Sequence, residues 1–206
     1  MTHQRLARLA ILLSGRGSNM LALAEAVRAG VLHGLAEVAV VFSNDPAAPG
    51  LEAAAALGLP TVSLLSKGRK RESFDLEVAD ILRQYRPDYV VLAGYMRVLS
   101  PAFVRAFAGR IINIHPADTH QHQGLHAYEW AFDNRLPATK ITVHLVDEGL
   151  DTGPILAQQV VNLEGAATLA EVQRRGLAVE HVLYAQTLAN LLTEAAAPAP
   201  SPTPNS

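Results

Sequence analysis

Two short segments of the sequence hold residue types that could transfer an acyl group, and the first contains Asn113 and His115. Both residues follow the apolar run 108–112, which is typical of a buried strand. Residues two apart in an extended chain point to the same side, so the amide and the imidazole are predicted to emerge together at a strand end. An amide can donate a hydrogen bond to a developing oxyanion, and an imidazole can carry or donate a proton.

The second segment adds a carboxylate, Asp151, after the apolar run 141–146. A lone Asn-x-His pair is weak evidence for a site, because most such pairs are solvated loop residues. The carboxylate strengthens the interpretation, since Asn113, His115 and Asp151 together could stabilise an oxyanion and move a proton. The alternative for Asp151 is purely structural, in which it caps the turn before Pro154.

The composition of the 206 residues fits one ordinary α/β domain, which we expect to be cytoplasmic. Hydrophobic residues make up 50% of the chain and aromatic residues only 5%, so aliphatic side chains must build the core. A net charge of −2 provides no global field that favours nucleic acid or an anionic membrane. The absence of cysteine excludes disulfides, thiolate metal sites and cysteine nucleophiles. No apolar run approaches the roughly 20 residues that span a bilayer.

Strand-like and helix-like segments alternate along the first half of the chain, which predicts a parallel sheet with right-handed crossovers. The expected fold is an open, mostly parallel twisted sheet of the Rossmann-like kind, with helices on both faces and antiparallel strands near the C-terminal end. Residues 1–194 are predicted to form a single domain, and 195–206, rich in Ala, Pro and Ser, a disordered tail. The predicted strands are 10–13, 38–42, 61–64, 89–92, 108–112, 141–146 and 155–161, and the predicted helices are 19–28, 51–57, 71–85 and 169–192, with one more beginning at Ser100-Pro101.

A glycine-rich turn, Ser14 to Asn19, connects the first predicted strand to the first predicted helix. Glycines let the backbone approach an anion closely, and the free N–H groups at a helix start attract phosphate. The glycine spacing fits neither the dinucleotide-binding fingerprint nor a P-loop. The alternative is an ordinary strand-to-helix turn in which Ser18 is the N-cap.

Four ordered segments of the chain together resemble the formyltetrahydrofolate-dependent formyltransferases, and most closely those that act on glycinamide ribonucleotide. The segments are 14–19, 92–100, 113–116 and 143–154, and the similarity extends from about Leu9 to about Leu192. The resemblance implies transfer of a formyl group from 10-formyltetrahydrofolate to the amine of glycinamide ribonucleotide in de novo purine biosynthesis. It implies small-molecule substrates, no nucleic acid or membrane partner, and a monomer or a homodimer.

The resemblance also assigns roles to individual residues. The implied catalytic set is Asn113, His115 and Asp151; the implied ribonucleotide contacts are Gly17, Ser18, Asn19 and Glu180; and the implied folate contacts are Arg71, Met96, Arg97, Val98, Leu99, His144, Asp147 and Glu148. Each set has a simpler alternative. Arg71 could be a solvated charge in a basic run, Val98 and Leu99 could be core residues, and Glu180 could be a surface carboxylate.

In the implied mechanism, the substrate amine attacks the formyl carbon and negative charge develops on the formyl oxygen. Asn113 donates a hydrogen bond to that oxygen, and a protonated His115 stabilises the charge. Asp151 organises a water that relays the proton to the folate nitrogen, and it holds His115 in its charged form. No metal and no covalent intermediate is required.

The chain departs from this family most clearly in residues 117–123, between His115-Pro116 and Gly124. Relatives carry an apolar, proline-stiffened segment there, so the loop is predicted to be more mobile or closed by different contacts. Lys140 also stands where relatives usually have Gly. Four histidines, at 115, 120, 122 and 126, suggest a metal site, but no carboxylate follows a recognised zinc spacing, so no metal is expected.

Other functions remain open from the sequence. Methionyl-tRNA formyltransferases add a C-terminal domain and formyltetrahydrofolate hydrolases an N-terminal one, and neither is expected here. Sugar-nucleotide formyltransferases lack the combination of the 14–19 turn with Glu180-His181. A nucleotide-binding relative without catalysis is the remaining alternative, because a changed lid loop can abolish function.

Overall fold

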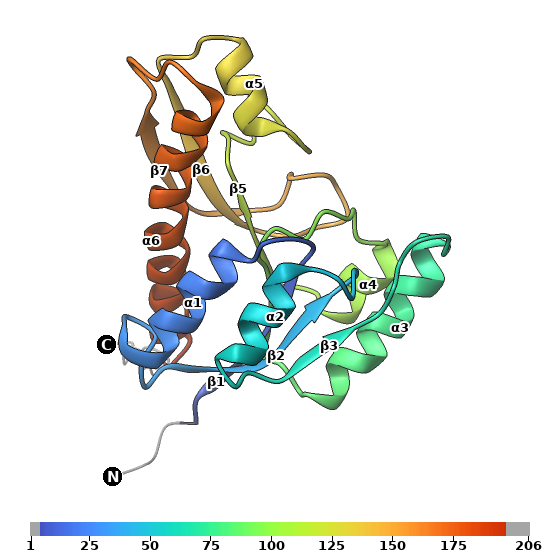
Figure 1. The fold of residues 1–206 in the computed structure, drawn as a ribbon. Helices are drawn as coiled ribbons and strands as arrows, with labels where there is room; N and C mark the ends of the chain where they lie inside the picture. The colour runs from blue at the N-terminus through green and yellow to red at the C-terminus, as the bar shows by residue number, and fades with distance from the viewer. Residues whose placement is uncertain (1–4, 197–206) are drawn as a thin grey trace, which may run out of the picture.

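The computed structural model describes residues 5–196, which form a seven-stranded sheet with helices on both faces (Figure 1). The strand order is β3-β2-β1-β4-β5-β6-β7. The strands are β1 (Ala7–Leu13), β2 (Ala36–Ser43), β3 (Thr61–Ser63), β4 (Tyr89–Leu92), β5 (Ile111–His115), β6 (Ala138–Leu145) and β7 (Ile155–Asn162). The helices are α1 (Ser18–Ala29), α2 (Pro49–Ala56), α3 (Arg71–Gln84), α4 (Pro101–Ala106), α5 (Ala127–Asp133) and α6 (Leu169–Ala196).

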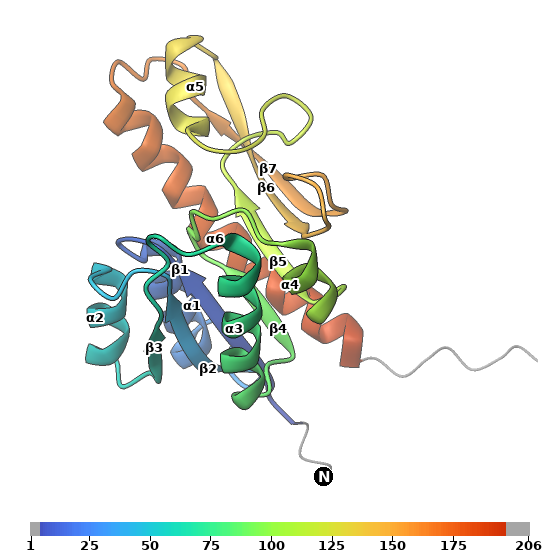
Figure 2. The same cartoon turned by 90° about the vertical axis from the view of Figure 1, so that its right-hand side faces the viewer.

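The alternation of side chains along β1 explains why helices cover both faces of the sheet. Leu9, Ile11 and Leu13 pack into the core that includes α1 and α6, whereas Ala10 and Leu12 pack into the core that includes α3 and α4. Successive residues of a strand face opposite sides, and a strand buried on both sides is therefore apolar throughout. Figure 2 shows α3 and α4 on the face opposite α6.

The order of the strands creates a crevice at the carboxyl ends of β1 and β4. The chain runs outward from β1 through β2 to β3 and then returns to β4, which lies on the other side of β1. Open α/β sheets bind ligands at such a switch point. Here the Ser14 N–H donates to Gly94 O at 3.0 Å, and the Met96 N–H donates to Ser14 Oγ at 2.8 Å. The two segments predicted to bind ligands are therefore neighbours.

The expected fold class is confirmed, with the parallel strands β1 to β5 followed by the antiparallel strands β6 and β7. The predicted strand 108–112 is placed too early, because β5 continues through His115. Asn113 and His115 pair with His144 and Thr142 of β6, so both lie within the strand and not beyond its end. Pairing with β6 keeps this polar stretch extended.

One helix and one helix end also differ from the sequence prediction. The short helix α5 was not predicted, because the segment around it has no clear apolar periodicity. Helix α6 continues through Ala196, so it includes the first two residues of the predicted tail. The rest of that tail, 197–206, lies outside the described residues. No helix within residues 5–196 is long and apolar enough to cross a membrane.

Candidate active site

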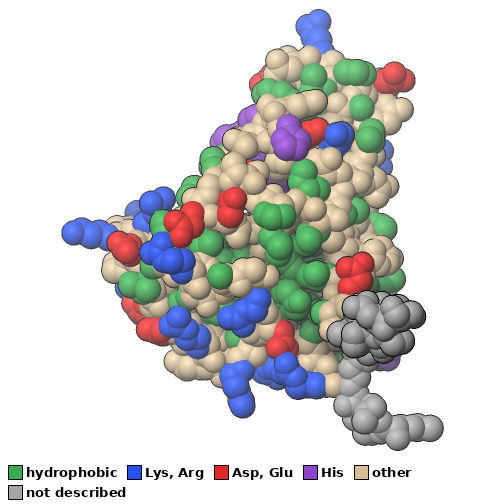
Figure 3. All heavy atoms as spheres, turned by 180° about the vertical axis from the view of Figure 1, so that it is seen from behind, with side chains coloured by type: hydrophobic (Ala, Val, Ile, Leu, Met, Phe, Trp, Pro, Cys, Tyr) green, Lys and Arg blue, Asp and Glu red, His purple; other side chains and the backbone are tan. Residues whose placement is uncertain are grey.

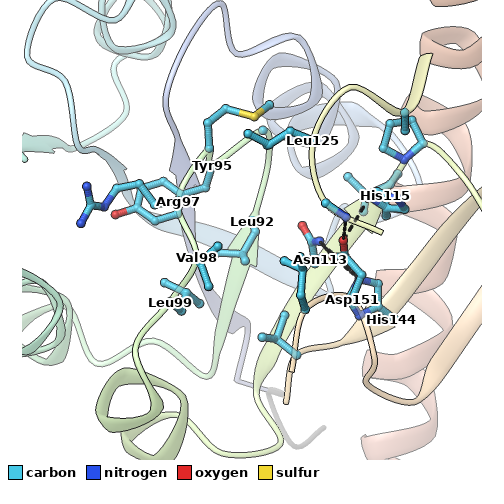
Figure 4. Close-up of a pocket in the computed structure, with 18 of the residues that line it drawn as sticks. Leu92, Tyr95, Arg97, Val98, Leu99, Asn113, His115, Leu125, His144 and Asp151 are labelled. Atoms are coloured by element: carbon cyan, nitrogen blue, oxygen red, sulfur yellow. Dashed lines mark hydrogen bonds and ion pairs between the residues drawn. The ribbon is translucent and has the colours of Figure 1, made fainter. Parts of the chain in front are cut away.

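A cavity of about 290 Å³ opens at the carboxyl ends of β4 and β5 (Figure 4). Its walls come from the segment after β4, from β5, from the chain just before α5, and from the loop between β6 and β7. The predicted site residues that line it are Met96, Arg97, Val98, Leu99, Asn113, His115, His144, Asp147 and Asp151. The three implied catalytic residues and most of the implied folate contacts are thus in one cavity.

Asp151 lies at the centre of the polar group in this cavity. Its Oδ1 accepts a hydrogen bond from Asn113 Nδ2 at 3.3 Å, and its Oδ2 lies 3.5 Å from His115 Nδ1. Oδ2 also accepts from the Gly124 N–H at 2.8 Å. The carboxylate therefore joins β5 to two separate loops, and it is not only a turn cap.

The backbone at Asp151 is unusual, and the loop around it is tightly folded. Asp151 has a φ of 52°, in the left-handed region that few residues other than glycine adopt, although Asp and Asn tolerate it best. Two residues later, a Cβ on Gly153 would collide with the carbonyl of Leu145 at the end of β6. This tight return to the end of β6 brings the Asp151 carboxylate against β5, and strain of this kind is concentrated at functional sites.

His115 has a hydrogen-bond acceptor on each side of its ring. Its Nε2 lies 3.0 Å from the backbone carbonyl of His122, which can only accept, so Nε2 carries a proton. Its Nδ1 faces Asp151. Burial lowers the pKa of His115 below its ordinary value of 6.5, although Asp151 and the His122 carbonyl oppose that shift. The ring is therefore neutral in the unliganded protein near pH 7, whereas the sequence-based mechanism has it charged.

Asp151 is charged under the same conditions. Burial raises the pKa of Asp151, but the contact with the His144 ring and the hydrogen bond from the Gly124 N–H outweigh that effect. The result is a pKa below the ordinary value of 3.8. A charged carboxylate thus faces a neutral imidazole, and a proton that arrives at His115 Nδ1 meets a ready acceptor.

His144 contacts the catalytic group directly. It is 1% exposed, and it lies opposite Asn113 in the pairing of β5 with β6. Its Nδ1 donates to Leu145 O at 2.9 Å, while its Nε2 lies 3.3 Å from Asn113 Nδ2 and 3.5 Å from Asp151 Oδ1. His144 therefore contacts both the amide and the carboxylate, and it lines the same cavity as the other implied folate contacts there.

The segment after β4 forms an apolar wall of the cavity. Met96 is 62% exposed and Val98 is 51% exposed, and both line the cavity. The Arg97 guanidinium lies over the Phe74 ring, 4.5 Å from its centroid. Exposed apolar side chains gathered in a concavity favour contact with a flat organic ligand. On the face in Figure 3, apolar side chains occupy the centre, between the histidines above and a mixture of basic and acidic side chains below.

Two implied folate contacts lie away from the cavity, and a third forms hydrogen bonds within its own loop. Arg71 is exposed as the first residue of α3 and does not line the cavity. Glu148 accepts from Arg105 Nη1 at 2.8 Å on the surface. Asp147 does line the cavity, but its Oδ1 accepts from Thr152 Oγ1 at 2.7 Å and from the Gly149 N–H at 3.0 Å.

The glycine-rich turn has the geometry of an anion site at the start of α1. Gly17 has a φ of 76°, and a Cβ there would lie 2.9 Å from Gly50 Cα, so both conformation and space require glycine. Gly17 is also the N-cap, and no side chain caps the helix. The alternative prediction of Ser18 as N-cap is therefore wrong, because Ser18 is the first helical residue. The N–H groups of the first turn remain available to an anion.

Glu180 and Asn19 come together although 161 residues separate them. Asn19 Nδ2 donates to Glu180 Oε2 at 2.5 Å, and the Tyr128 hydroxyl donates to Glu180 Oε1. Glu180 is 4% exposed, so it is not a surface carboxylate. Sequence reasoning missed Tyr128, because nothing in its neighbourhood signals a partner on α6.

The loop 117–123, which was expected to depart from the family pattern, is anchored to the sheet. Asp118 is buried and accepts from Lys140 Nζ at 2.7 Å and from the His120 N–H at 3.1 Å. The His122 ring stacks between His115 and Trp130, with centroid distances of 6.2 and 4.8 Å. The loop is therefore closed by contacts of Asp118 and His122 with the sheet and with α5. Within residues 5–196, no group of three or more His, Asp or Glu side chains could hold a metal ion.

Comparison with known proteins gives a consistent result. A family model described as formyl transferase matches residues 7–188. Phosphoribosylglycinamide formyltransferase of Escherichia coli (strain K12) is 38% identical over 175 residues, which are 84% of this chain and 82% of that protein. Trifunctional purine biosynthetic protein adenosine-3 of Drosophila melanogaster is also 38% identical. That match covers 93% of this chain but only 14% of the Drosophila protein, which is much longer.

A solved structure extends the match to three dimensions. The crystal structure of phosphoribosylglycinamide formyltransferase from Bacillus halodurans has a TM-score of 0.86 and 41% identity, and the match covers 91% of this chain and 96% of that one. The family match, the bacterial relative and the shared fold agree. The chain therefore belongs to the formyl transferase family, among the phosphoribosylglycinamide formyltransferases.

Proposed function

We propose that this protein transfers the formyl group of 10-formyltetrahydrofolate to the amine of glycinamide ribonucleotide, a step of purine biosynthesis. The observation that carries the proposal is the contact of Asp151 with both Asn113 and His115 in a cavity at the end of the parallel strands. We expect the reaction to take place in the cytoplasm, in one domain of residues 1–194 that acts as a monomer or homodimer without nucleic acid or membrane.

The two substrates occupy adjoining parts of the crevice in this proposal. The ribonucleotide phosphate binds the N–H groups of Gly17, Ser18 and Asn19, and its ribose approaches Glu180. The pterin ring of the folate enters the cavity beside Met96 and the chain that leads to Asp151. The contacts of Ser14 with Gly94 and Met96 support this arrangement, because they place the two binding segments edge to edge.

The reaction then needs only the side chains already described. The amine nitrogen attacks the formyl carbon, and the new C–N bond leaves a negative oxygen that accepts from Asn113. The attacking nitrogen loses a proton to neutral His115, through a water held by Asp151, and the imidazolium formed lies beside the oxyanion. Collapse of the intermediate breaks the bond to the folate nitrogen, which takes up the proton. His115 is neutral again at the end.

Outside the cavity, Arg71 and Glu148 have a smaller part in this proposal. Arg71 can meet only a portion of the folate that extends beyond the cavity, since it does not line the wall. Glu148 contributes through the backbone of its loop, because its side chain is paired with Arg105. Direct side-chain contact with the folate is therefore assigned first to Met96 and Val98, which are exposed in the cavity wall.

A turnover assay with the purified protein tests the proposal. Glycinamide ribonucleotide and a formyl-folate analogue are supplied separately and together, and deformylated folate is followed by absorbance. Deformylation that requires both substrates is the expected result. Deformylation without the ribonucleotide would indicate a hydrolase, and ribonucleotide binding without turnover would indicate the non-catalytic relative.

A further inference from the structure

Glu180 is a buried carboxylate whose two oxygens are each held by a different element. Asn19 on α1 donates to Oε2 at 2.5 Å, and Tyr128 on α5 donates to Oε1. A buried carboxylate is stable only when donors replace the water it has lost. Because both oxygens have donors, the orientation of the carboxylate plane is fixed by α1 and α5 together.

Gly176 makes the Tyr128 contact possible. A Cβ at this position would collide with the Tyr128 ring and with its hydroxyl oxygen. Gly176 lies four residues before Glu180, so the two are on the same face of α6. Glycine destabilises the middle of a helix relative to alanine, and the space that it leaves for the Tyr128 ring explains its presence.

The donors and acceptors of this cluster specify the chemistry of what could bind it. Burial raises the pKa of Tyr128, and the nearby Glu180 raises it further, so the phenol stays protonated and donates. The carboxylate fixes Asn19 with its NH₂ group toward Glu180. Asn19 Oδ1 is then buried, and among the described residues it has no partner. The unused atoms are acceptors, which suits a ligand with hydroxyl donors.

We propose that Tyr128, seated over Gly176, is a positioning residue that orients Glu180 toward the ribose hydroxyls of the ribonucleotide. This inference rests on the proposed function. No hydrogen bond joins Tyr128 to Asn113, His115 or Asp151 in the structure, whereas its neighbour Ala127 lines the cavity. Tyr128 therefore acts on ribonucleotide binding and not on the transfer of the formyl group.

The test compares Tyr128→Phe, Glu180→Gln and the double variant by steady-state kinetics with each substrate varied. Tyr128→Phe keeps the ring and removes the donor, so we expect the ribonucleotide KM to rise by roughly tenfold. The turnover number and the folate KM should stay within about twofold of wild type, because neither depends on Glu180. In the Glu180→Gln background, Tyr128→Phe should add less than about twofold, since residues that act through one another are not additive.

Gly176→Ala and Tyr184→Phe complete the design. Gly176→Ala displaces the ring and should raise the ribonucleotide KM as Tyr128→Phe does. Tyr184→Phe is the matched control: it also removes a buried hydroxyl, but one that donates to the Leu92 and Ile112 carbonyls. It should lower the melting temperature and leave the ribonucleotide KM unchanged.

Calorimetric titration with the ribonucleotide alone separates failure of this inference from failure of the proposed function. Wild type that does not bind the ribonucleotide would refute both. Wild type that binds, with Tyr128→Phe binding equally well, would refute only the positioning role. The positioning role would also be refuted if the effects of Tyr128→Phe and Glu180→Gln on the ribonucleotide KM were fully additive. An equal rise of the ribonucleotide KM and the folate KM in Tyr128→Phe would refute it too.

Discussion

At the scale of single residues, Asp151 connects the amide of Asn113 to the imidazole of His115. We expect Asp151→Asn to lower the turnover number by roughly a hundredfold, because it removes the charge that stabilises the protonated His115 and holds the relaying water. Asn tolerates the left-handed φ of 52° and can cap the turn, so the fold should be kept. Both substrates should bind within a fewfold of wild type, measured by KM and by titration. Near-wild-type turnover would limit Asp151 to a structural role.

The protonation of His115 gives a second prediction at this scale. The base must be neutral, and burial holds the pKa of His115 below 6.5. Activity should therefore be full at neutral pH and fall only as the pH drops through that lowered pKa. A profile of kcat/KM against pH reports this value for the free protein. An acid limb centred above pH 6.5 would contradict the lowered pKa of His115. Activity that rises toward acid would show that the charged ring is the reactive form.

The sequence predicted that Asn113, His115 and Asp151 come together, because their side-chain types and the two-residue spacing of the first two limit the possible chemistry. It could not predict Tyr128 or the carbonyl of His122. Both act through contacts that depend on how α5 and its preceding loop pack, and a backbone carbonyl carries no sequence signal at all. The lowered pKa of His115 could not be predicted for a related reason, since the degree of burial follows from the whole fold.

At the scale of elements, the loop 117–123 is tied to β6 by Lys140 and Asp118. Both residues lie where the sequence was expected to depart from the family. Lys140→Met leaves a buried carboxylate without its charged donor, which costs about 1–3 kcal/mol. A melting temperature lower by roughly 2–4 °C per kcal/mol is expected, with a fewfold loss of turnover because His122 loses its anchor beside His115.

An exposed ion pair provides the control for this change. Arg83→Met breaks the ion pair with Asp80, in which the Arg83 side chain is 53% exposed and the Asp80 side chain 72% exposed. This change should alter neither the melting temperature nor the turnover number. Lys140→Arg should keep most of the stability. If Lys140→Met melts and turns over as wild type does, the loop is held by its other contacts.

Elements with long aliphatic runs were predictable, because burial on both faces of the sheet demands such runs. The end of β5 was not, since polar Asn113 and His115 remain extended only through pairing with β6. Helix α5 was missed because seven residues are too few to show a helical period.

At the scale of the whole molecule, both substrates bind at the switch point of the sheet in the proposed mechanism, and the chemistry uses an amide, an imidazole and a carboxylate. We therefore expect turnover to survive exhaustive treatment with a chelator followed by gel filtration. Loss of activity that stoichiometric zinc restores would contradict this mechanism and would support a metal site at the histidines of the 117–126 region.

The central claim is that the formyl group moves from one substrate to the other within this cavity, and an isotopic label follows it directly. The protein is incubated with ¹³C-formyl folate and the ribonucleotide, and the products are separated and examined by mass spectrometry. The label should appear on the ribonucleotide amine in equal amount to the deformylated folate, and Asp151→Asn should slow both together. Label recovered as free formate, with the ribonucleotide unmodified, would contradict the account.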